Sequence, residues 1–178
     1  MREYLKQLLT WTLMSTMIFV TVPVANAQHT KFEENLKQLQ AKKLQKQLTC
    51  LARNVYYESN GEPIEGQIAV AQVTLNRAKS NLFPNDLCAV ITQSYYVEGD
   101  KVCQFSWYCD PKFDKTKVIS KDNISYIVAR KVLLEGEKIA KIGTDVFFFR
   151  RHDVYMHPSW PNKTIIRIGN HVFYKRER

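Results

Sequence analysis

The sequence has few residues of the kinds that bind metals, and their spacing is poor for that purpose. It contains four cysteines and four histidines, and no two cysteines form the CxxC pair typical of structural zinc sites. His152 and His157 are badly spaced for two ligands on one helix or strand face. We therefore expect no metal and no cofactor. A zinc-dependent amidase or peptidase that uses His152, His157 and His171 with an acid remains an alternative.

The sequence also lacks internal repeats and low-complexity tracts. Its content of 45% hydrophobic and 12% aromatic residues excludes disorder as the main state. A chain of 178 residues fits one modest domain plus a targeting segment, and such a domain buries enough surface to fold without a metal. We expect it to be a monomer.

The first 27 residues have the pattern of a secretory signal peptide. Arg2 and Lys6 give a basic start, residues 8–24 are almost wholly apolar, and Ala25-Asn26-Ala27 fits a signal peptidase site. We expect cleavage after Ala27 and transient membrane contact through this segment. A retained anchor is the alternative, because an apolar run of about 17 residues lies at the lower limit for spanning a bilayer. In both cases the rest of the chain is exported, to the periplasm or the cell exterior.

Export makes disulfides the natural use of the cysteines. The even count favours two bridges among four residues, Cys50, Cys88, Cys103 and Cys109. Four cysteines allow three pairings, and the sequence does not choose among them.

The charge balance is strongly basic, with 26 lysines and arginines against 17 acidic residues and a net charge of +9. An exported protein rarely meets nucleic acid, so we expect no such partner. The charge suits an anionic polymer or envelope, although a merely soluble basic surface would have the same composition.

The pattern of apolar residues divides the rest of the chain into a linker and a domain. Residues 28–47 are rich in Lys, Gln and Leu and predict a basic helical linker, with an apolar stripe of Phe32, Leu36, Leu39 and Leu44. Residues 48–178 predict one folded domain. Within it we expect four helices, over residues 48–59, 63–77, 87–91 and 122–135.

Turn residues and alternation define the remaining elements. Ser59-Asn60-Gly61 ends the first helix, Pro63 opens the second, and Asp122 could cap the fourth. The second helix has a predicted apolar face of Ile64, Ile68, Ala71 and Leu75. Residues 146–149 predict a strand, and residues 165–168 and 171–174 predict a hairpin around Gly169-Asn170. Helices followed by a small antiparallel sheet predict an α+β fold.

Glu58 is the main candidate for chemistry. Leu51, Val55 and Glu58 lie on one face of the predicted helix, so the carboxyl group would lie on the side that packs inward, at the helix's C-terminal end. Lost hydration and the negative end of the helix dipole would both raise its pKa. A carboxyl group that is protonated near neutral pH can act as a general acid. The alternative is a frayed helix end with Glu58 in water.

Several ordered blocks of the sequence resemble the cell wall hydrolase family of spore cortex-lytic enzymes and related bacterial and phage lysins. The resemblance spans Cys50 to Lys175. Its blocks are Tyr57-Glu58-Ser59-Asn60-Gly61-Glu62-Pro63, Gly66-Gln67-Ile68-Ala69-Val70-Ala71, Leu75-Asn76-Arg77, Cys103-Gln104-Phe105-Ser106-Trp107 and Gly169-Asn170-His171. The family often has Ala-Arg at the position of Ser59-Asn60, and the match over residues 144–160 is loose.

The resemblance implies a lysozyme-like α+β domain that acts on peptidoglycan glycan strands. The bond would be the β-1,4 link between N-acetylmuramic acid and N-acetylglucosamine, and the family's essential glutamate corresponds to Glu58. Residues 48–178 would then be the catalytic cell wall hydrolase domain. A non-catalytic module that binds cell walls through its basic surface is a further alternative.

The number of carboxylates bears on the mechanism. Hydrolysis of a glycosidic bond ordinarily needs two carboxylates, roughly 5–9.5 Å apart, whereas a lytic transglycosylase can use one residue first as acid and then as base. Possible second carboxylates are Glu62, Glu65, Asp86 and Asp110. Glu62 and Glu65 are better explained as acids in the first turn of the second helix. We therefore favour the scheme with one carboxylate.

Five residues are candidates for binding substrate. In an extended segment Gln104 and Ser106 would face one side, toward the sugar cleft, while Phe105 and Trp107 face the other. A core strand is the alternative, and Trp107 is more easily explained as scaffold. Aromatic rings can stack on sugars, although most aromatic residues are simply core. The complete set of candidates is Tyr57, Gln104, Ser106, Trp160 and His171.

Overall fold

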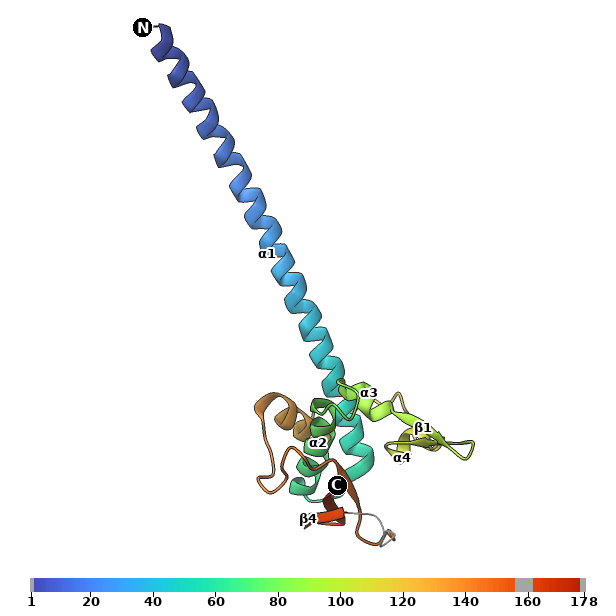
Figure 1. Ribbon diagram of the computed structural model, residues 1–178. Helices are drawn as coiled ribbons and strands as arrows, with labels where there is room; N and C mark the ends of the chain where they lie inside the picture. Colours follow the sequence, from blue (N-terminus) through green and yellow to red (C-terminus); the bar gives the residue numbers. More distant parts are fainter. Residues whose placement is uncertain (1, 156–161, 177–178) are drawn as a thin grey trace. The chain divides into compact units, whose positions relative to one another are not determined.

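The structure is a computed structural model that describes residues 2–155 and 162–176. The chain divides into two compact units, one up to Leu44 and one from Gln45 onward. Helix α1 (Arg2–Ser59) belongs to the first unit along most of its length, and its last turns belong to the second (Figure 1). Within the described residues, no helix is long and apolar enough to cross a membrane. The division into a signal peptide, a linker and a domain stays a prediction.

The predicted linker is helical, as expected. The four apolar residues of its stripe are all exposed: Phe32, Leu36, Leu39 and Leu44. The first buried side chain among residues 28–155 is that of Leu48.

Helix α2 (Ile64–Lys79) forms the centre of the second unit. Every residue from Gly66 to Thr74 is buried, and so are Asn76 and Arg77. The prediction of an apolar stripe on one face was therefore too narrow, because the small residues of this helix let other segments approach it on several sides. The inclusion of Ile64 in that stripe was wrong. This residue opens the helix and is 52% exposed.

Buried polar side chains of α2 hold the segment that leads to the C-terminal sheet. The Gln72 amide donates to the Ile142 carbonyl (2.6 Å) and accepts from the Ile139 N–H (2.8 Å). The Asn76 amide donates to the carbonyls of Gly143 (2.9 Å) and Val146 (3.1 Å). Because buried polar groups are costly when unpaired, these bonds fix the path of residues 139–146.

The remaining helices are short: α3 (Leu87–Thr92), α4 (Ser106–Cys109), α5 (Ile124–Arg130) and the π-helix η1 (Lys131–Glu135). The predicted cap Asp122 was wrong by one position, because the Asn123 side chain accepts from the Ser125 N–H at 2.9 Å. Gly136 ends the last helix in the left-handed region, with φ of 76°.

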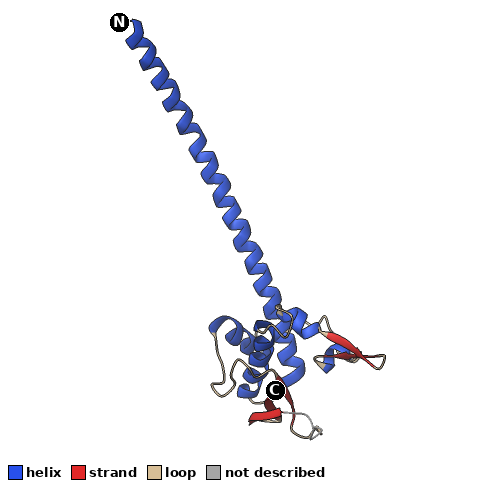
Figure 2. Cartoon of the chain, viewed as in Figure 1, coloured by secondary structure: helices blue, strands red, loops and turns tan. Residues whose placement is uncertain are grey.

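Two small antiparallel sheets complete the second unit (Figure 2). One is the hairpin of β1 (Ser94–Val97) and β2 (Asp100–Cys103). The other has the strand order β3-β5-β4, from β3 (Phe148–Arg151), β4 (Asn162–Ile168) and β5 (His171–Arg176). The predicted hairpin is confirmed, since Ile168 pairs with His171 around Gly169 and Asn170. The strand predicted over 146–149 lies two residues later, at β3, because α2 holds residue 146.

The four cysteines form two disulfides, as predicted, and the structure selects one of the three pairings. Cys50 bonds to Cys88 and joins α1 to α3, while Cys103 bonds to Cys109 and joins β2 to the end of α4. Both bridges lie beside the segments that surround Glu58.

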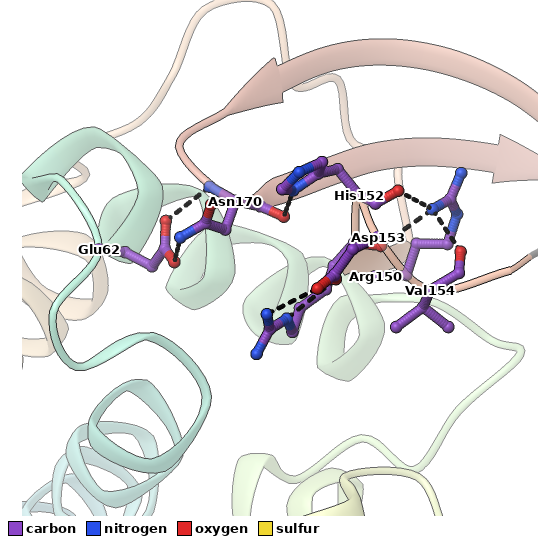
Figure 3. Close-up of polar contacts among 7 residues, drawn as sticks. Glu62, Arg150, His152, Asp153, Val154 and Asn170 are labelled. Carbon is purple, nitrogen blue, oxygen red and sulfur yellow. Dashed lines mark hydrogen bonds and ion pairs between the residues drawn. The ribbon is translucent and has the colours of Figure 1, made fainter.

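A polar bond closes the second unit between residues far apart in the sequence. The Glu62 carboxylate accepts from the Asn170 backbone N–H (2.9 Å) and from its side-chain amide (3.0 Å), as Figure 3 shows. The expectation that Glu62 acts in the first turn of α2 was wrong, because its side chain binds the turn between β4 and β5. Glu65 does lie in the first turn of α2.

Gly169 gives a test of this bond. Its φ is +55°, and a methyl group there would meet the Glu62 carboxylate and Pro63. We expect Gly169→Ala to lower the free energy of unfolding by about 2–3 kcal/mol, because it adds backbone strain and displaces Glu62 from Asn170. Urea unfolding would measure the loss.

The matched control is Gly99→Ala, at a turn with φ of +94° and no atom within 4 Å of the added methyl group. Only the backbone strain should remain there, about 1 kcal/mol. Equal losses in the two variants would show that the contact with Glu62 is unimportant.

Candidate active site

Glu58 lies one residue before the end of α1, on the face of two fully buried residues, Leu51 and Val55. The residue as a whole is half-buried, and its carboxyl group is the part that lies away from solvent. Burial raises the pKa of the Glu58 carboxyl group from 4.5 to about 7, against the charge of the nearby Arg77 guanidinium, which lowers it. The carboxyl group is therefore divided between its protonated and ionised forms near neutral pH.

Two hollows meet at Glu58. The Tyr57 hollow has a volume of about 400 Å³ and the Arg77 hollow about 270 Å³, and three residues border both: Glu58, Ser106 and Phe149. A chain that occupied both hollows would pass directly over the Glu58 carboxyl group. Among the described residues that line them, Glu58 is the one carboxylic acid.

Aromatic rings form one wall of the Tyr57 hollow. The Tyr57 ring lies 4.7 Å from that of Trp107 and 5.1 Å from that of Phe113, between centroids. Its hydroxyl group donates to the Asp114 carbonyl at 2.7 Å. The ring is thus held in place on the cleft side of α1, where it can offer an apolar surface to a ligand.

Trp107 is mainly scaffold, in agreement with the sequence analysis. It is 3% exposed, and its indole N–H donates to the Asn54 side chain at 2.9 Å. The Asn54 amide in turn donates to the Thr74 hydroxyl group at 3.1 Å. This buried chain of bonds connects α4, α1 and α2 behind Glu58.

Arg77 is the important residue that the sequence analysis missed. It is 3% exposed, its Nε donates to the Phe147 carbonyl at 2.7 Å, and its guanidinium lies 4.9 Å from the Phe105 ring centroid. Burial lowers the pKa of Arg77 to about 10, while the charge of Glu58 raises it. The residue stands in the family block Leu75-Asn76-Arg77, but helical periodicity gave no sign that it lies opposite Glu58.

Gln104 and Ser106 border the cleft, although not as members of one extended strand. Ser106 begins helix α4 and is exposed, whereas Gln104 is half-buried and precedes it. The prediction of a continuous extended segment was therefore wrong. With its amide oxygen toward the guanidinium, Gln104 accepts from Arg77 at 3.2 and 3.3 Å. Phe105 and Trp107 point into the core, as predicted.

His171 lies on the opposite wall of the Tyr57 hollow, at the start of β5. It is 5% exposed, and its Nδ1 is 3.9 Å from a Glu62 carboxylate oxygen. Burial lowers the pKa of His171, against the charge of Glu62, which raises it. The imidazole is therefore neutral at pH 7. Two other predicted positions, Trp160 and His157, lie outside the described residues.

Two arginines of β3 border the same hollow. Arg150 Nη1 donates to the carbonyls of Arg151, His152 and Val154, at 2.9, 3.2 and 2.9 Å, and so shapes the loop after β3 (Figure 3). Arg151 pairs with Asp153 at 2.8 Å. Arg151 is exposed there, with its charge balanced by that of Asp153.

The other proposed second carboxylates have different structural roles. Asp86 caps α3 by accepting from the Ala89 N–H at 3.0 Å, and Asp110 accepts from the Lys112 N–H at 2.9 Å. Glu65 is exposed on α2. Glu62 is likewise bonded to Asn170. Of the acids considered, Glu58 is therefore the one that borders the two hollows.

The raised pKa of Glu58 predicts a specific dependence of stability on pH. Between pH 4.5 and 7 the folded protein keeps the Glu58 proton that the unfolded chain has lost, so the free energy of unfolding falls as the pH rises. This contribution is present in full below pH 4.5 and is lost through pH 7, about 3 kcal/mol in total.

We therefore expect Glu58→Gln to remove that slope. The free energy of unfolding of the variant, taken relative to that of the parent, should be higher at pH 8 than at pH 5. Denaturant unfolding at both pH values measures this difference. Glu65→Gln, at an exposed position of α2, is the control and should keep the parent slope. A parallel pH dependence in Glu58→Gln and the parent would mean that this carboxyl group has an ordinary pKa.

Comparison with known proteins places this geometry in a family. The family model described as Cell Wall Hydrolase matches residues 61–174. The spore cortex-lytic enzyme of Oceanobacillus iheyensis is 51% identical over 132 residues, which are 74% of this chain and 42% of that protein. The spore cortex-lytic enzyme of Bacillus subtilis is 32% identical over 127 residues, 71% of this chain and 36% of that protein. The chain thus spans less than half the length of these relatives.

Solved structures agree with the sequence comparison. The catalytic domain of the Bacillus cereus SleB protein has a TM-score of 0.56 and 27% identity, over 74% of this chain and 91% of that domain. The catalytic domain of the germination-specific lytic transglycosylase SleB from Bacillus anthracis has a TM-score of 0.53 and 27% identity, over 72% and 93%. The predicted α+β fold of the lysozyme-like type is confirmed. The chain belongs to the cell wall hydrolase family.

Proposed function

We propose that this protein degrades peptidoglycan by cleaving the β-1,4 bond between N-acetylmuramic acid and N-acetylglucosamine as a lytic transglycosylase. The observation that carries the proposal is a single buried carboxyl group, that of Glu58, at the junction of two hollows. The similarity to a catalytic domain described as a lytic transglycosylase supports the same reaction class.

In the first step, protonated Glu58 donates its proton to the glycosidic oxygen. The bond between that oxygen and the anomeric carbon of the muramyl residue breaks, the N-acetylglucosamine leaves with the proton, and positive charge develops on the muramyl ring. Glu58 is now a carboxylate beside this charge. Because burial keeps this carboxylate away from bulk water, the attraction is stronger than it would be in solution.

In the second step, the Glu58 carboxylate removes the proton from the muramyl 6-hydroxyl group. The freed oxygen attacks the anomeric carbon and closes a 1,6-anhydro ring, so that Glu58 is protonated again. One residue serves both steps, and a pKa of about 7 suits a group that must be acid and base in turn. No second carboxylate is needed to activate water.

Arg77 adjusts Glu58 for this double role. Burial alone would favour the protonated form of Glu58 and would make a poor proton acceptor in the second step. The fixed charge of Arg77 lowers the pKa of Glu58 and stabilises the carboxylate that remains after proton donation. Because Phe147, Gln104 and the Phe105 ring already hold the guanidinium, no reorganisation is required during the reaction.

The walls of the cleft supply the proposed contacts with substrate. Tyr57 offers a ring that can stack on a sugar face, Ser106 offers a hydroxyl group where the two hollows meet, and Gln104 offers an amide in the Arg77 hollow. His171 would orient polar groups on the opposite wall, and Trp160 remains a proposed contact. We further propose that the protein acts outside the cytoplasm, at the cell wall, as a monomer exported by its first 27 residues.

The experiment that tests this function is the digestion of purified sacculi by Glu58→Gln. We expect a loss of activity of about a thousandfold, because proton donation is lost, with a circular dichroism spectrum and binding to sacculi like those of the parent. Glu65→Gln should keep the parent activity.

Mass spectrometry of the soluble products separates the possible reactions. We expect 1,6-anhydro-muropeptides. Reducing muramyl ends would instead indicate a muramidase, and free stem peptides that disappear with a chelator would indicate a zinc amidase. Full activity of Glu58→Gln would refute the proposed role of this residue.

A further inference from the structure

Three consecutive phenylalanines border a longer series of hollows than the reaction requires. Phe149 borders the Tyr57 and Arg77 hollows, and Phe148 borders the Arg77 hollow and a third one, which we name the Phe83 hollow. Phe147 borders the Phe83 hollow and a fourth, the Asn81 hollow. Each of the three residues thus borders two of the hollows, so this segment runs alongside all four.

Other shared residues show that the hollows adjoin one another. Gln104 borders both the Arg77 and the Phe83 hollows, while Leu82 and Asp145 border both the Phe83 and the Asn81 hollows. The Phe83 and Asn81 hollows, which do not border Glu58, have volumes of about 600 and 550 Å³. Both are larger than the two hollows that border Glu58. The series therefore extends further from Glu58 on the side of Gln104 than on the side of Tyr57.

The lining of the outer hollows combines apolar surface with small polar groups. Leu82 is 70% exposed, and the half-buried rings of Phe83 and Phe147 lie 5.6 Å apart between centroids. The neutral polar residues of the Asn81 hollow are Asn76, Ser80, Asn81 and Thr144. Such a mixture of ring faces, amides and hydroxyl groups suits a sugar, which has both apolar C–H faces and hydroxyl edges.

The walls of these hollows are fixed in advance of binding. Asn76 holds the segment before Phe147 through the carbonyls of Gly143 and Val146, and Arg77 holds the Phe147 carbonyl itself. Three charged residues line the Phe83 and Asn81 hollows: Lys79, Asp145 and Lys175. Lys175 and Asp145 pair with each other at 2.6 Å. Hydrogen bonds therefore hold the Phe147 side of the lining, and the charges of the lining nearly balance.

We propose that the Phe83 and Asn81 hollows bind further sugars of the same glycan strand, on one side of the bond that is cleaved at Glu58. The enzyme then selects long strands and cleaves away from their ends. This inference rests on the proposed function, since the strand is placed by its scissile bond. The outer hollows are continuous with the inner ones through Phe148 and Gln104. This continuity favours the glycan backbone over a stem peptide as their occupant.

The test compares Leu82→Ser with the parent on two substrates. One is a mixture of long, purified glycan strands, and the other is the shortest peptidoglycan fragment that the parent cleaves. We expect kcat/KM on long strands to fall about fivefold and kcat/KM on the short fragment to stay unchanged. The control is Val118→Ser, because Val118 is also a loop residue, is 81% exposed and lies outside all four hollows.

Several outcomes would overturn the inference. Unchanged kinetics on long strands, or equal losses on both substrates, would show that Leu82 does not contact a distal sugar. A loss that vanishes when stem peptides are removed from the strands would assign the outer hollows to the peptide. Glu58→Gln is assayed in parallel, and its continued activity would refute the proposed function rather than the longer groove.

Discussion

The properties of the candidate active site depend on the burial of one carboxyl group beside one buried guanidinium. Removing Glu58 from water favours its protonated form, and the charge of Arg77 opposes that effect, so that the pKa is about 7 and not that of an ordinary glutamate. Neither effect alone would suit the role that we propose for Glu58, which is to donate a proton and then accept one. In the proposed reaction with a single carboxylate, this balance between burial and charge is what lets Glu58 serve in both steps.

The rest of the second unit serves to hold that pair. Leu51 and Val55 anchor the end of α1 in the core, and the buried bonds from Trp107 to Asn54 and from Asn54 to Thr74 connect α4 to both long helices. Two disulfides fix the segments before and after the cleft residues. The bond between Glu62 and Asn170 closes the opposite side against the C-terminal hairpin. The cleft is thus rigid on each side of Glu58.

The sequence predicted features that depend on local patterns and on resemblance. The face of Leu51, Val55 and Glu58 follows from helical spacing, and the turn at Gly169-Asn170 follows from residue type. Arg77 and the pairing of Glu62 with Asn170 could not be predicted in this way, because these contacts join residues that only the folded chain brings together. The disulfide pairing was open for the same reason. Helix α4 was missed because four residues are too few to show a period.

The most direct test of this account is a titration of the Glu58 carboxyl group itself, by NMR of protein labelled with ¹³C at glutamate side chains. Assignment through Glu58→Gln identifies its resonance. The account predicts a midpoint near pH 7, well above the value of 4.5 for an unperturbed glutamate. A midpoint close to 4.5 would contradict it, because the carboxyl group would then be ionised at neutral pH and would have no proton to donate to a glycosidic oxygen.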